Sequence, residues 1–216
     1  MLSGMTSTKL PESLRQGVLG EGRAAAARSL LLAGVVIGTN LIYGALNHGP
    51  NRIFLRTPLD DAIPVVPVFA VPYVSLIPLV GVSLVVMLVL RVRIYRSAAF
   101  AMITAWFVSY AFYLVLQSYV DRPMIIGTDI FSSMVRTIYS ADAPYNDFPS
   151  LHTSLSVIVA IHWLRIDRRI GIPVALWTSL IVASTLLIHQ HYVADVALGL
   201  VVAAGASWLA PRVLRG

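Results

Sequence analysis

The sequence predicts an all-α integral membrane protein, built as a bundle of six transmembrane helices. Hydrophobic residues make up 57% of the 216-residue chain and charged residues only 12%, about half of the charged share of an ordinary soluble domain. A transmembrane helix needs about 20 apolar residues in a row. Six apolar segments approach this length, at residues 24–46, 67–90, 98–118, 150–165, 171–189 and 192–210.

Two regions are expected along the chain. Residues 1–22 are more polar than the rest, so they are predicted to form a cytoplasmic tail or an interfacial helix outside the bilayer core. Residues 23–216 contain all six apolar segments and are predicted to form the membrane domain. The chain has no cysteine, which excludes disulfide bonds and thiolate chemistry.

The connections between the apolar segments differ in charge, and this difference predicts the orientation of the bundle. Most of the 16 basic residues lie in one set of connections, namely Lys9, Arg15, Arg23, Arg28, Arg91, Arg93, Arg96, Arg165, Arg168, Arg169, Arg212 and Arg215. Cytoplasmic connections carry the excess of lysine and arginine in membrane proteins. We therefore expect cytoplasmic termini and place residues 47–66, 119–149 and 189–191 on the outer side. Topology also explains the net charge of +6, so no nucleic acid partner is expected.

Two histidines and an aspartate reach the same predicted face. His152 lies in the first turn of the fourth segment, and His191 and Asp195 lie where the fifth segment gives way to the sixth. His191 and Asp195 are four residues apart, so on a helix they share a face. A carboxylate that holds the Nδ1–H of His191 leaves Nε2 free as a nucleophile. His152 is then the candidate proton donor for the leaving group.

The same face also carries groups that suit a phosphate. Arg122 follows the third segment and offers planar, forked donors to phosphate oxygens. Ser150 is expected to cap the fourth segment, where the free backbone N–H groups around Leu151 lie at the positive end of the helix dipole. Together these residues predict a phosphoryl-transfer site, at which catalysis is mostly positioning and charge stabilisation.

Each of these residues also has a simpler interpretation. A histidine and an aspartate four residues apart are often only a structural pair on a helix. Ser150 alone is often only a helix cap, and Arg122 alone can be an interfacial anchor. An ionisable pair inside a membrane segment is functional by default, and this favours the catalytic interpretation.

Two other classes of function stay open. In the first, a metal ion is held by His152, His189, His191 and Asp195. The chain lacks the Glu-x-x-His and His-Glu-x-x-His patterns of metallohydrolases, so no metal is expected. In the second, the protein is a transporter whose polar residues line a pathway, but the sequence shows no inverted repeat.

Three short motifs lie in order along the chain: "RP" at 122–123, "PSLH" at 149–152 and "STLLIHQHYVAD" at 184–195. They resemble the three motifs of the type-2 phosphatidic acid phosphatase superfamily, which includes lipid phosphatases, vanadium haloperoxidases and sphingolipid head-group transferases. By layout the resemblance covers roughly residues 60–210. It implies a six-helix bundle with its site at the extracytoplasmic face, and neither a metal nor a cofactor.

The resemblance also implies a role for each matching residue. His191 corresponds to the nucleophile that carries a phosphohistidine, and Asp195 to the carboxylate that orients it. His152 corresponds to the proton donor for the leaving group. Arg122 and Ser150 correspond to phosphate ligands.

The chain departs from the phosphatase form of these motifs at three positions. Val115 stands where the first motif has a lysine, Leu151 where the second has a glycine, and Thr185 where the third has an arginine after Ser184. Two cationic phosphate ligands are therefore missing, and a phosphodiester suits such a site better because it carries less charge than a monoester. Further phosphate contacts are expected from the Leu151 backbone, Ser184 and Thr185, and from Arg136 in place of a missing cation.

These departures favour one branch and one reaction. The Pro-Ser-Leu-His and His-Tyr-x-x-Asp forms are more similar to the inositol phosphorylceramide synthase and sphingomyelin synthase-like branch. The expected function is a phosphotransferase that moves a phosphate-bearing head group between lipids, or from a lipid to an alcohol, through a phosphohistidine. The alternative is a lipid phosphate or pyrophosphate phosphohydrolase. The expected partners are a lipid substrate and the membrane, and the expected location is the bacterial inner membrane.

Overall fold

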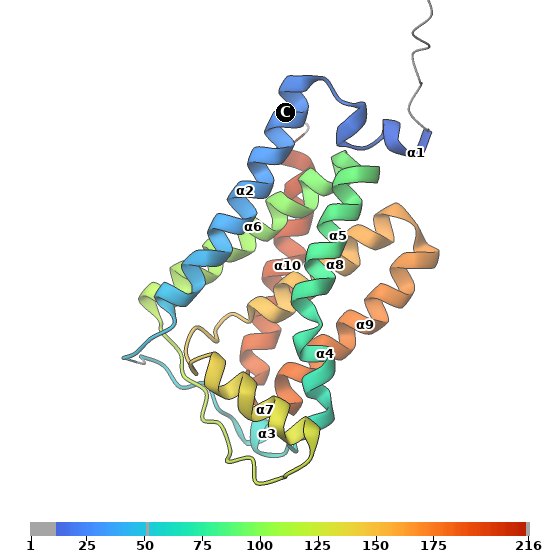
Figure 1. Ribbon diagram of the computed structural model, residues 1–216. Helices are drawn as coiled ribbons and strands as arrows, with labels where there is room; N and C mark the ends of the chain where they lie inside the picture. The colour runs from blue at the N-terminus through green and yellow to red at the C-terminus, as the bar shows by residue number, and fades with distance from the viewer. Residues whose placement is uncertain (1–11, 51, 215–216) are drawn as a thin grey trace, which may run out of the picture.

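The protein is a helical bundle, seen in a computed structural model that describes residues 12–50 and 52–214 (Figure 1). Apart from two isolated bridges, Ile53–Ser118 and Tyr119–Tyr145, this described part of the chain contains no β-structure. The predicted all-α class is therefore confirmed. The predicted N-terminal tail lies partly outside the described residues, as do Lys9 and Arg215.

Among the described residues, five helical runs are long and apolar enough to cross a membrane. They are α2 (Arg23–Leu46), the run Pro67–Leu90, α6 (Val92–Val115), α9 (Arg168–Leu187) and α10 (Val193–Val213). The run Pro67–Leu90 consists of the short 3₁₀ helix η2 (Pro67–Phe69), α4 (Ala70–Val74) and α5 (Leu76–Leu90). The protein is thus an integral, multi-pass membrane protein. The fourth predicted segment forms α8 (Leu151–Ile166), whose 16 residues are apolar but fall short of a full span, so the sixth span stays a prediction.

The third helix begins earlier and ends earlier than the predicted segment 98–118. Helix α6 begins at Val92 because its charged first turns are stabilised by the N-terminal region: Arg96 Nη2 lies 2.7 Å from Glu21 Oε2. It ends at Val115, and the next residues turn into the connection. The Gln117 amide donates hydrogen bonds to the carbonyl of Leu46 and to the side chain of Asn146. These tertiary contacts decide the boundaries of α6.

The connection 119–149 contains a helix that the sequence pattern did not predict. Helix α7 (Ile130–Ala141) is capped by Asp129, whose carboxylate accepts hydrogen bonds from the backbone N–H groups of Phe131 and Ser132. It buries Val135 and Ile138 against a small cluster formed by Ala70, Tyr73 and Ile188. Shorter helices lie at α1 (Glu12–Arg15), η1 (Val18–Gly20) and α3 (Pro58–Asp61).

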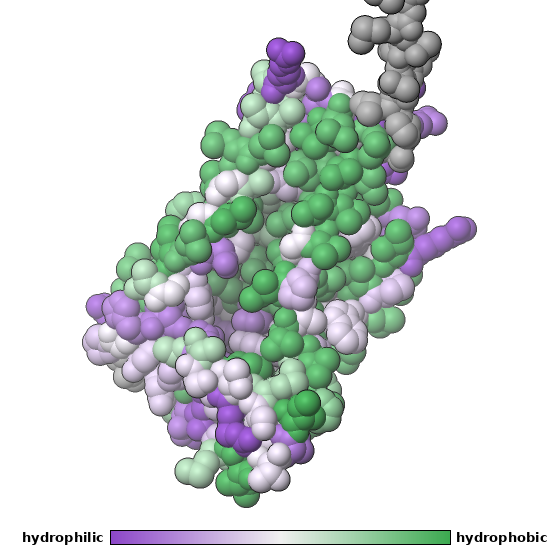
Figure 2. Space-filling view, in the orientation of Figure 1, coloured by the Kyte–Doolittle hydropathy of each residue, from purple (hydrophilic) through white to green (hydrophobic). Residues whose placement is uncertain are grey.

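Helix α6 occupies the centre of the bundle and packs against α2, α5, α8 and α10. Helix α1 and the C-terminal end of α10 lie at one end of the molecule, and α3 and α7 lie at the other (Figure 1). The surface over the long helices is largely hydrophobic, whereas hydrophilic residues gather at the two ends (Figure 2). This arrangement suits a bilayer, which requires apolar side chains on every lipid-facing surface.

A close approach of α10 to the start of α8 brings two of the three motifs together. The Ser150 N–H donates a hydrogen bond to the Asp195 carbonyl (3.0 Å), and the Ser154 hydroxyl donates one to the Gly199 carbonyl (3.0 Å). Gly199 allows this approach because a Cβ atom at that position would lie 2.8 Å from the Ser150 carbonyl oxygen and 3.0 Å from Thr153 Cβ. The contacted atoms are backbone and a β-branched side chain, so neither moves away cheaply.

We expect Gly199→Ala to lower the thermal midpoint of the purified protein and to reduce its activity. Overpacking of this kind costs about 1–3 kcal/mol, more than alanine gains over glycine in a helix. Gly205→Ala is the matched control, because a Cβ atom at Gly205 on the same helix meets nothing within 4 Å. Equal thermal midpoints for the two variants would show that the approach of α10 to α8 is not tight.

Candidate active site

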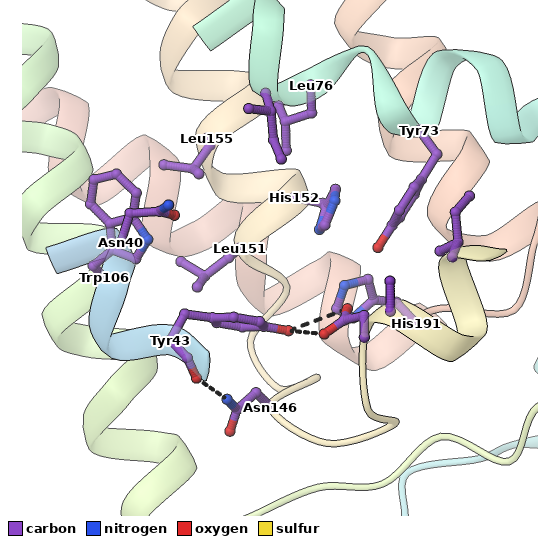
Figure 3. A pocket seen from close by; sticks show the side chains of 14 residues that line it. Asn40, Tyr43, Tyr73, Leu76, Trp106, Asn146, Leu151, His152, Leu155 and His191 are labelled. Carbon is purple, nitrogen blue, oxygen red and sulfur yellow. Dashed lines mark hydrogen bonds between the residues drawn. The ribbon is translucent and has the colours of Figure 1, made fainter. Parts of the chain in front are cut away.

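A cavity of about 350 Å³ lies between α2, α5, α6, α7 and α8, near the end of the bundle that carries α3 and α7. One part of its wall is polar and contains Tyr43, Asp142, His152 and His191 (Figure 3). The rest is mostly apolar and continues along α2 and α5. The two histidines of the second and third motifs therefore line one cavity although they are 39 positions apart in the sequence.

His191 lies just before α10, in the tight connection that follows α9. Helix α9 ends at Leu187, Ile188 is its C-cap, and His189 adopts a positive φ of 49°. The backbone N–H groups of Gln190 and His191 both donate to the Thr185 carbonyl, at 2.8 and 3.1 Å. This turn fixes the His191 backbone. The spacing predicted that His191 and Asp195 share one helix face. This is wrong, because α10 begins only at Val193 and His191 lies before it.

Asp195 is nevertheless next to His191. Its Oδ2 atom accepts a hydrogen bond from the Tyr192 N–H at 2.7 Å, as part of a capping box at the start of α10. The same oxygen lies 3.5 Å from His191 Nδ1, an ion-pair distance slightly longer than a good hydrogen bond. Asp195 Oδ1 is buried and has no hydrogen-bond partner within the described structure. One oxygen of the carboxylate thus lies next to the imidazole, and the other has no hydrogen-bond partner among the described residues.

His152 lies in the first turn of α8 and faces His191 across the cavity. The centroids of the two imidazole rings are 6.0 Å apart. The His152 ring stacks on Tyr73 of α4, with centroids 4.2 Å apart and planes inclined by 17° (Figure 3). Tyr73 fixes the orientation of His152. No motif pointed to Tyr73, since the contact joins two helices that are distant in the sequence.

Ser150 caps α8 as predicted, and its polar atoms already have partners. Its hydroxyl accepts a hydrogen bond from the Thr153 N–H at 3.2 Å, and the side chain is fully buried. Leu151 follows as the first residue of α8, and its side chain lines the cavity beside His152. The helix start therefore lies at the polar end of the cavity.

Arg122 lies near His191 because its guanidinium binds the side chain of Gln190, the residue before His191. Its Nη2 atom donates to Gln190 Oε1 at 2.5 Å, and Nη1 donates to the Asp142 carbonyl at 2.6 Å. The guanidinium also lies 5.0 Å from the centre of the Tyr139 ring. Its Nε atom is buried, and none of the described residues accepts a hydrogen bond from it. Gln190 was not predicted as a site residue, although it stands directly before His191.

Three further predicted residues do not line the cavity. The Ser184 and Thr185 hydroxyls are buried within α9 and donate to the carbonyls of Ile181 and Val182. Arg136 is exposed on α7, and its guanidinium donates to the carbonyls of Ile125 and Gly127. Thr185 contributes to the site through its backbone carbonyl, which holds the turn before His191.

Two aspartates near the site, Asp142 and Asp147, were not predicted as site residues. Asp142 lines the cavity and accepts a hydrogen bond from the Tyr43 hydroxyl at 3.2 Å (Figure 3). It accepts another from the Asn47 amide at 2.6 Å. Burial raises the pKa of Asp142 above its usual range, whereas the nearby Arg122 charge opposes this effect. Burial raises the pKa of Asp147 well above its usual range, and the Asp195 charge adds to this.

The candidate metal ligands are not all gathered at this site. His189 turns away from the cavity, and its Nε2 atom lies 3.0 Å from the Ile63 carbonyl oxygen. Within residues 12–50 and 52–214, no three histidine, cysteine, aspartate or glutamate side chains are arranged to hold a metal ion. The residues that do converge on the cavity are His152, His191 and Asp142. Asp195 lies behind His191, and Arg122 is held by the Asp142 carbonyl and Gln190.

Comparison with known proteins identifies one family. Residues 50–209 match the family model described as the PAP2 superfamily. The match covers the connection that carries Arg122, the connection that carries His191, and the helices that carry His152 and Asp195. No curated protein and no solved structure matches the chain.

Proposed function

The chain belongs to the PAP2 superfamily, and from this premise we propose that it is a membrane phosphotransferase with a histidine nucleophile. Members of this superfamily are generally phosphatases or phosphotransferases that act on phosphoesters, and lipid phosphoesters are the substrates that fit a membrane-embedded chain. The finer proposal is that a phosphate-bearing head group moves from a donor lipid to an alcohol, which is another lipid or a soluble acceptor.

One observation carries the proposal: His191, paired with a buried carboxylate at 3.5 Å, faces a second imidazole at 6.0 Å across a shared cavity. This spacing lets both rings contact one phosphoryl group. A nucleophile oriented by one group and faced by a proton donor is the arrangement that covalent catalysis requires. The simpler interpretation, a structural histidine–aspartate pair, does not account for the second histidine on the same cavity.

The proposed first step forms a bond between His191 Nε2 and phosphorus and breaks the bond between phosphorus and the donor alcohol. Asp195 holds the Nδ1 proton and stabilises the positive charge that develops on the ring. His152 gives its proton to the departing oxygen. The products of this step are the donor lipid alcohol and a phosphorylated His191.

The proposed second step reverses the proton transfer. His152, now neutral, takes the proton of the acceptor hydroxyl. The acceptor oxygen attacks phosphorus, and the bond between phosphorus and His191 breaks. The product is the transferred phosphoester, and both histidines return to their starting protonation states. A phosphohydrolase, the alternative, would use water in place of the acceptor alcohol and share every other atom movement.

The charges around the cavity favour a phosphodiester donor and hence transfer. Arg122 engages carbonyl and amide oxygens with its terminal nitrogens, and Val115 and Thr185 replace two cations of the phosphatase motifs. A site with few cations stabilises the single charge of a diester better than the larger charge of a monoester. Ser184, Thr185 and the Leu151 backbone remain proposed phosphate contacts, which would require rearrangement of the hydroxyls.

Product analysis separates transfer from hydrolysis. The purified protein is incubated in vesicles with a phospholipid labelled in its phosphate, with and without a long-chain alcohol acceptor. We expect labelled phosphate to appear in a new lipid, and only when the acceptor is present. If free phosphate or the free head-group phosphate is the sole labelled product with the acceptor in excess, the protein is a hydrolase. The Gly205→Ala variant serves as the matched active control.

The two arginines of the outer connection give a further prediction. We expect Arg122→Ala to lower kcat/KM by about a hundredfold, as removal of one charge-stabilising donor commonly does. Arg136→Ala should change kcat/KM by less than about twofold, because its side chain is exposed and bonded to loop carbonyls. Equal losses in the two variants would instead support Arg136 as the replacement for a missing cation.

We further propose that both termini are cytoplasmic and that the site faces the extracytoplasmic side of a bacterial inner membrane, with residues 1–22 as a cytoplasmic tail. The distribution of basic residues supports this orientation. Because the chain has no cysteine, a single introduced cysteine reports its own side of the membrane. A membrane-impermeant thiol reagent added to intact cells should label Arg52→Cys and not Arg168→Cys. The opposite labelling would reverse the orientation.

A further inference from the structure

We propose that Asn40 of α2 and Trp106 of α6 form a subsite for the hydrogen-bonding backbone of a lipid substrate, the ester or amide region next to the phosphate. The inference rests on the proposed function, in which the phosphate lies between His152 and His191. It predicts that the substrate is a glycerolipid or a sphingolipid and not a polyprenyl phosphate, whose chain is pure hydrocarbon beyond the phosphate.

The cavity reaches the lipid-facing surface between α2 and α5. Its wall includes Asn40 of α2 and Ile77 of α5, and both side chains are exposed, Ile77 by 79%. The surface is hollowed between these two helices (Figure 2). Both helices pack on α6, which forms the floor behind them. A lipid can therefore extend from the histidines to the bilayer without leaving the cavity.

Asn40 is a polar residue in an otherwise apolar setting. Along α2, Ile37, Leu41 and Ile42 expose 63%, 74% and 47% of their surface, as expected for side chains that face lipid. The Asn40 amide has no hydrogen bond to any residue in the described ranges. An amide that faces hydrocarbon without a partner is unfavourable, because nothing there satisfies its hydrogen-bonding groups. A polar group of a bound lipid would remove this cost.

Trp106 presents a second donor to the same cavity. Its side chain is 3% exposed and lines the cavity, yet its indole N–H makes no hydrogen bond within the part of the chain that the structure describes. In contrast, Trp163 and Trp177 each donate their indole N–H to a serine at 2.9 Å. Buried indole N–H groups usually find a partner. Asn40 and Trp106 thus offer two unpaired donors to one ligand (Figure 3).

The position of Asn40 along α2 matches the order of groups in such a lipid. Tyr43 reaches the polar end of the cavity, where its hydroxyl donates to Asp142. Asn40 precedes Tyr43 by three residues, so it lies about 4.5 Å further from that end along the helix axis. Proceeding from the histidines, a bound lipid would place its phosphate first, its ester or amide oxygens next to Asn40, and its chains beyond Ile77.

The test compares the binding of two phosphate monoesters that differ in this region. Dioctanoyl phosphatidic acid has ester carbonyls near its phosphate, and farnesyl phosphate has none. Each is titrated into the purified full chain at equal mole fraction in detergent micelles, and the apparent Kd is measured. We expect the wild type to bind the ester lipid about tenfold more tightly, which corresponds to about 1.4 kcal/mol.

Asn40→Leu should abolish this preference by weakening the binding of phosphatidic acid and leaving farnesyl phosphate unchanged. Trp106→Phe should reduce the preference, and Asn40→Gln, which keeps the amide, should retain part of it. The control is Leu41→Ala, an exposed position on the same helix that does not line the cavity. It should bind both probes like the wild type.

The outcomes of binding and turnover are separable. If the wild type binds both probes equally, or if Asn40→Leu keeps the preference, the subsite does not exist, whether or not the protein turns over lipids. If the preference is present and lost in Asn40→Leu while no phosphoester is turned over, the subsite stands and the proposed function fails.

Discussion

Replacing His191 by asparagine is expected to reduce turnover by about four orders of magnitude or more, as loss of a catalytic nucleophile commonly does. Asparagine cannot form the bond to phosphorus that the proposed first step requires. It is small enough to fit beside Asp195, so the turn held by the Thr185 carbonyl should persist. The measurement is kcat on a labelled lipid phosphoester, together with the thermal midpoint to confirm folding.

The neighbouring histidine provides the matched control. His189 lies two positions earlier, adopts a positive φ, and contacts the Ile63 carbonyl instead of the cavity. Asparagine tolerates that backbone conformation well. We expect His189→Asn to keep most of the activity. If His189→Asn and His191→Asn lose activity equally, His191 has no special chemical role.

A covalent intermediate gives a second readout for the same variant. In the wild type, brief incubation with labelled substrate should leave label on the protein that survives alkali and is lost in acid, the behaviour of phosphohistidine. The His191→Asn variant should carry no label. Label that persists in this variant would assign the nucleophile to another residue and overturn the proposed first step.

Replacing His152 by glutamine has the second largest expected effect. Loss of a general acid typically costs a factor of about 10² to 10⁴. The loss should depend on the leaving group: large for a lipid alcohol, which needs a proton, and much smaller for a p-nitrophenyl phosphoester, which does not. The measurement is the ratio of kcat/KM for these two substrates in the variant and in the wild type.

The buried His162 supplies the control for this ratio. His162 lies on the same helix as His152, but its ring contacts the Ser97 hydroxyl at 3.0 Å and the Ile158 carbonyl at 2.8 Å, away from the cavity. His162→Gln is expected to lower stability and leave the leaving-group ratio unchanged. A His152→Gln variant with the wild-type ratio would show that His152 binds or packs but does not donate a proton.

Tyr73 and Asp142 show why the sequence alone did not predict some residues of the site. Tyr73 stacks on His152, and Asp142 accepts a hydrogen bond from Tyr43, a partner 99 positions earlier in the chain. Neither residue stands in a recurring pattern of spacing. Each acquires its place from the packing of helices that are distant in sequence, and single-chain periodicity carries no signal for such contacts.

The amino-acid sequence by itself determined the helical membrane class, the approximate positions of the long apolar helices and the cap at Ser150. It also proposed His152, His191 and Asp195 as the catalytic set. The reason is local: in a bilayer the backbone must satisfy its hydrogen bonds within each helix, so apolar length predicts the helices directly. The three motifs are likewise recognised from residue types and their order along the chain, which need no tertiary structure.

Only the tertiary structure decided how these groups meet. It formed α7 within a connection, set His191 before α10 instead of on it, and turned Arg122 toward Gln190 while Arg136 bonded to loop carbonyls. It also left Asn40 and Trp106 facing one cavity. These outcomes depend on long-range packing and on hydrogen bonds between buried polar groups. Such a hydrogen bond contributes to the free energy of folding only when the fold has brought both partners together.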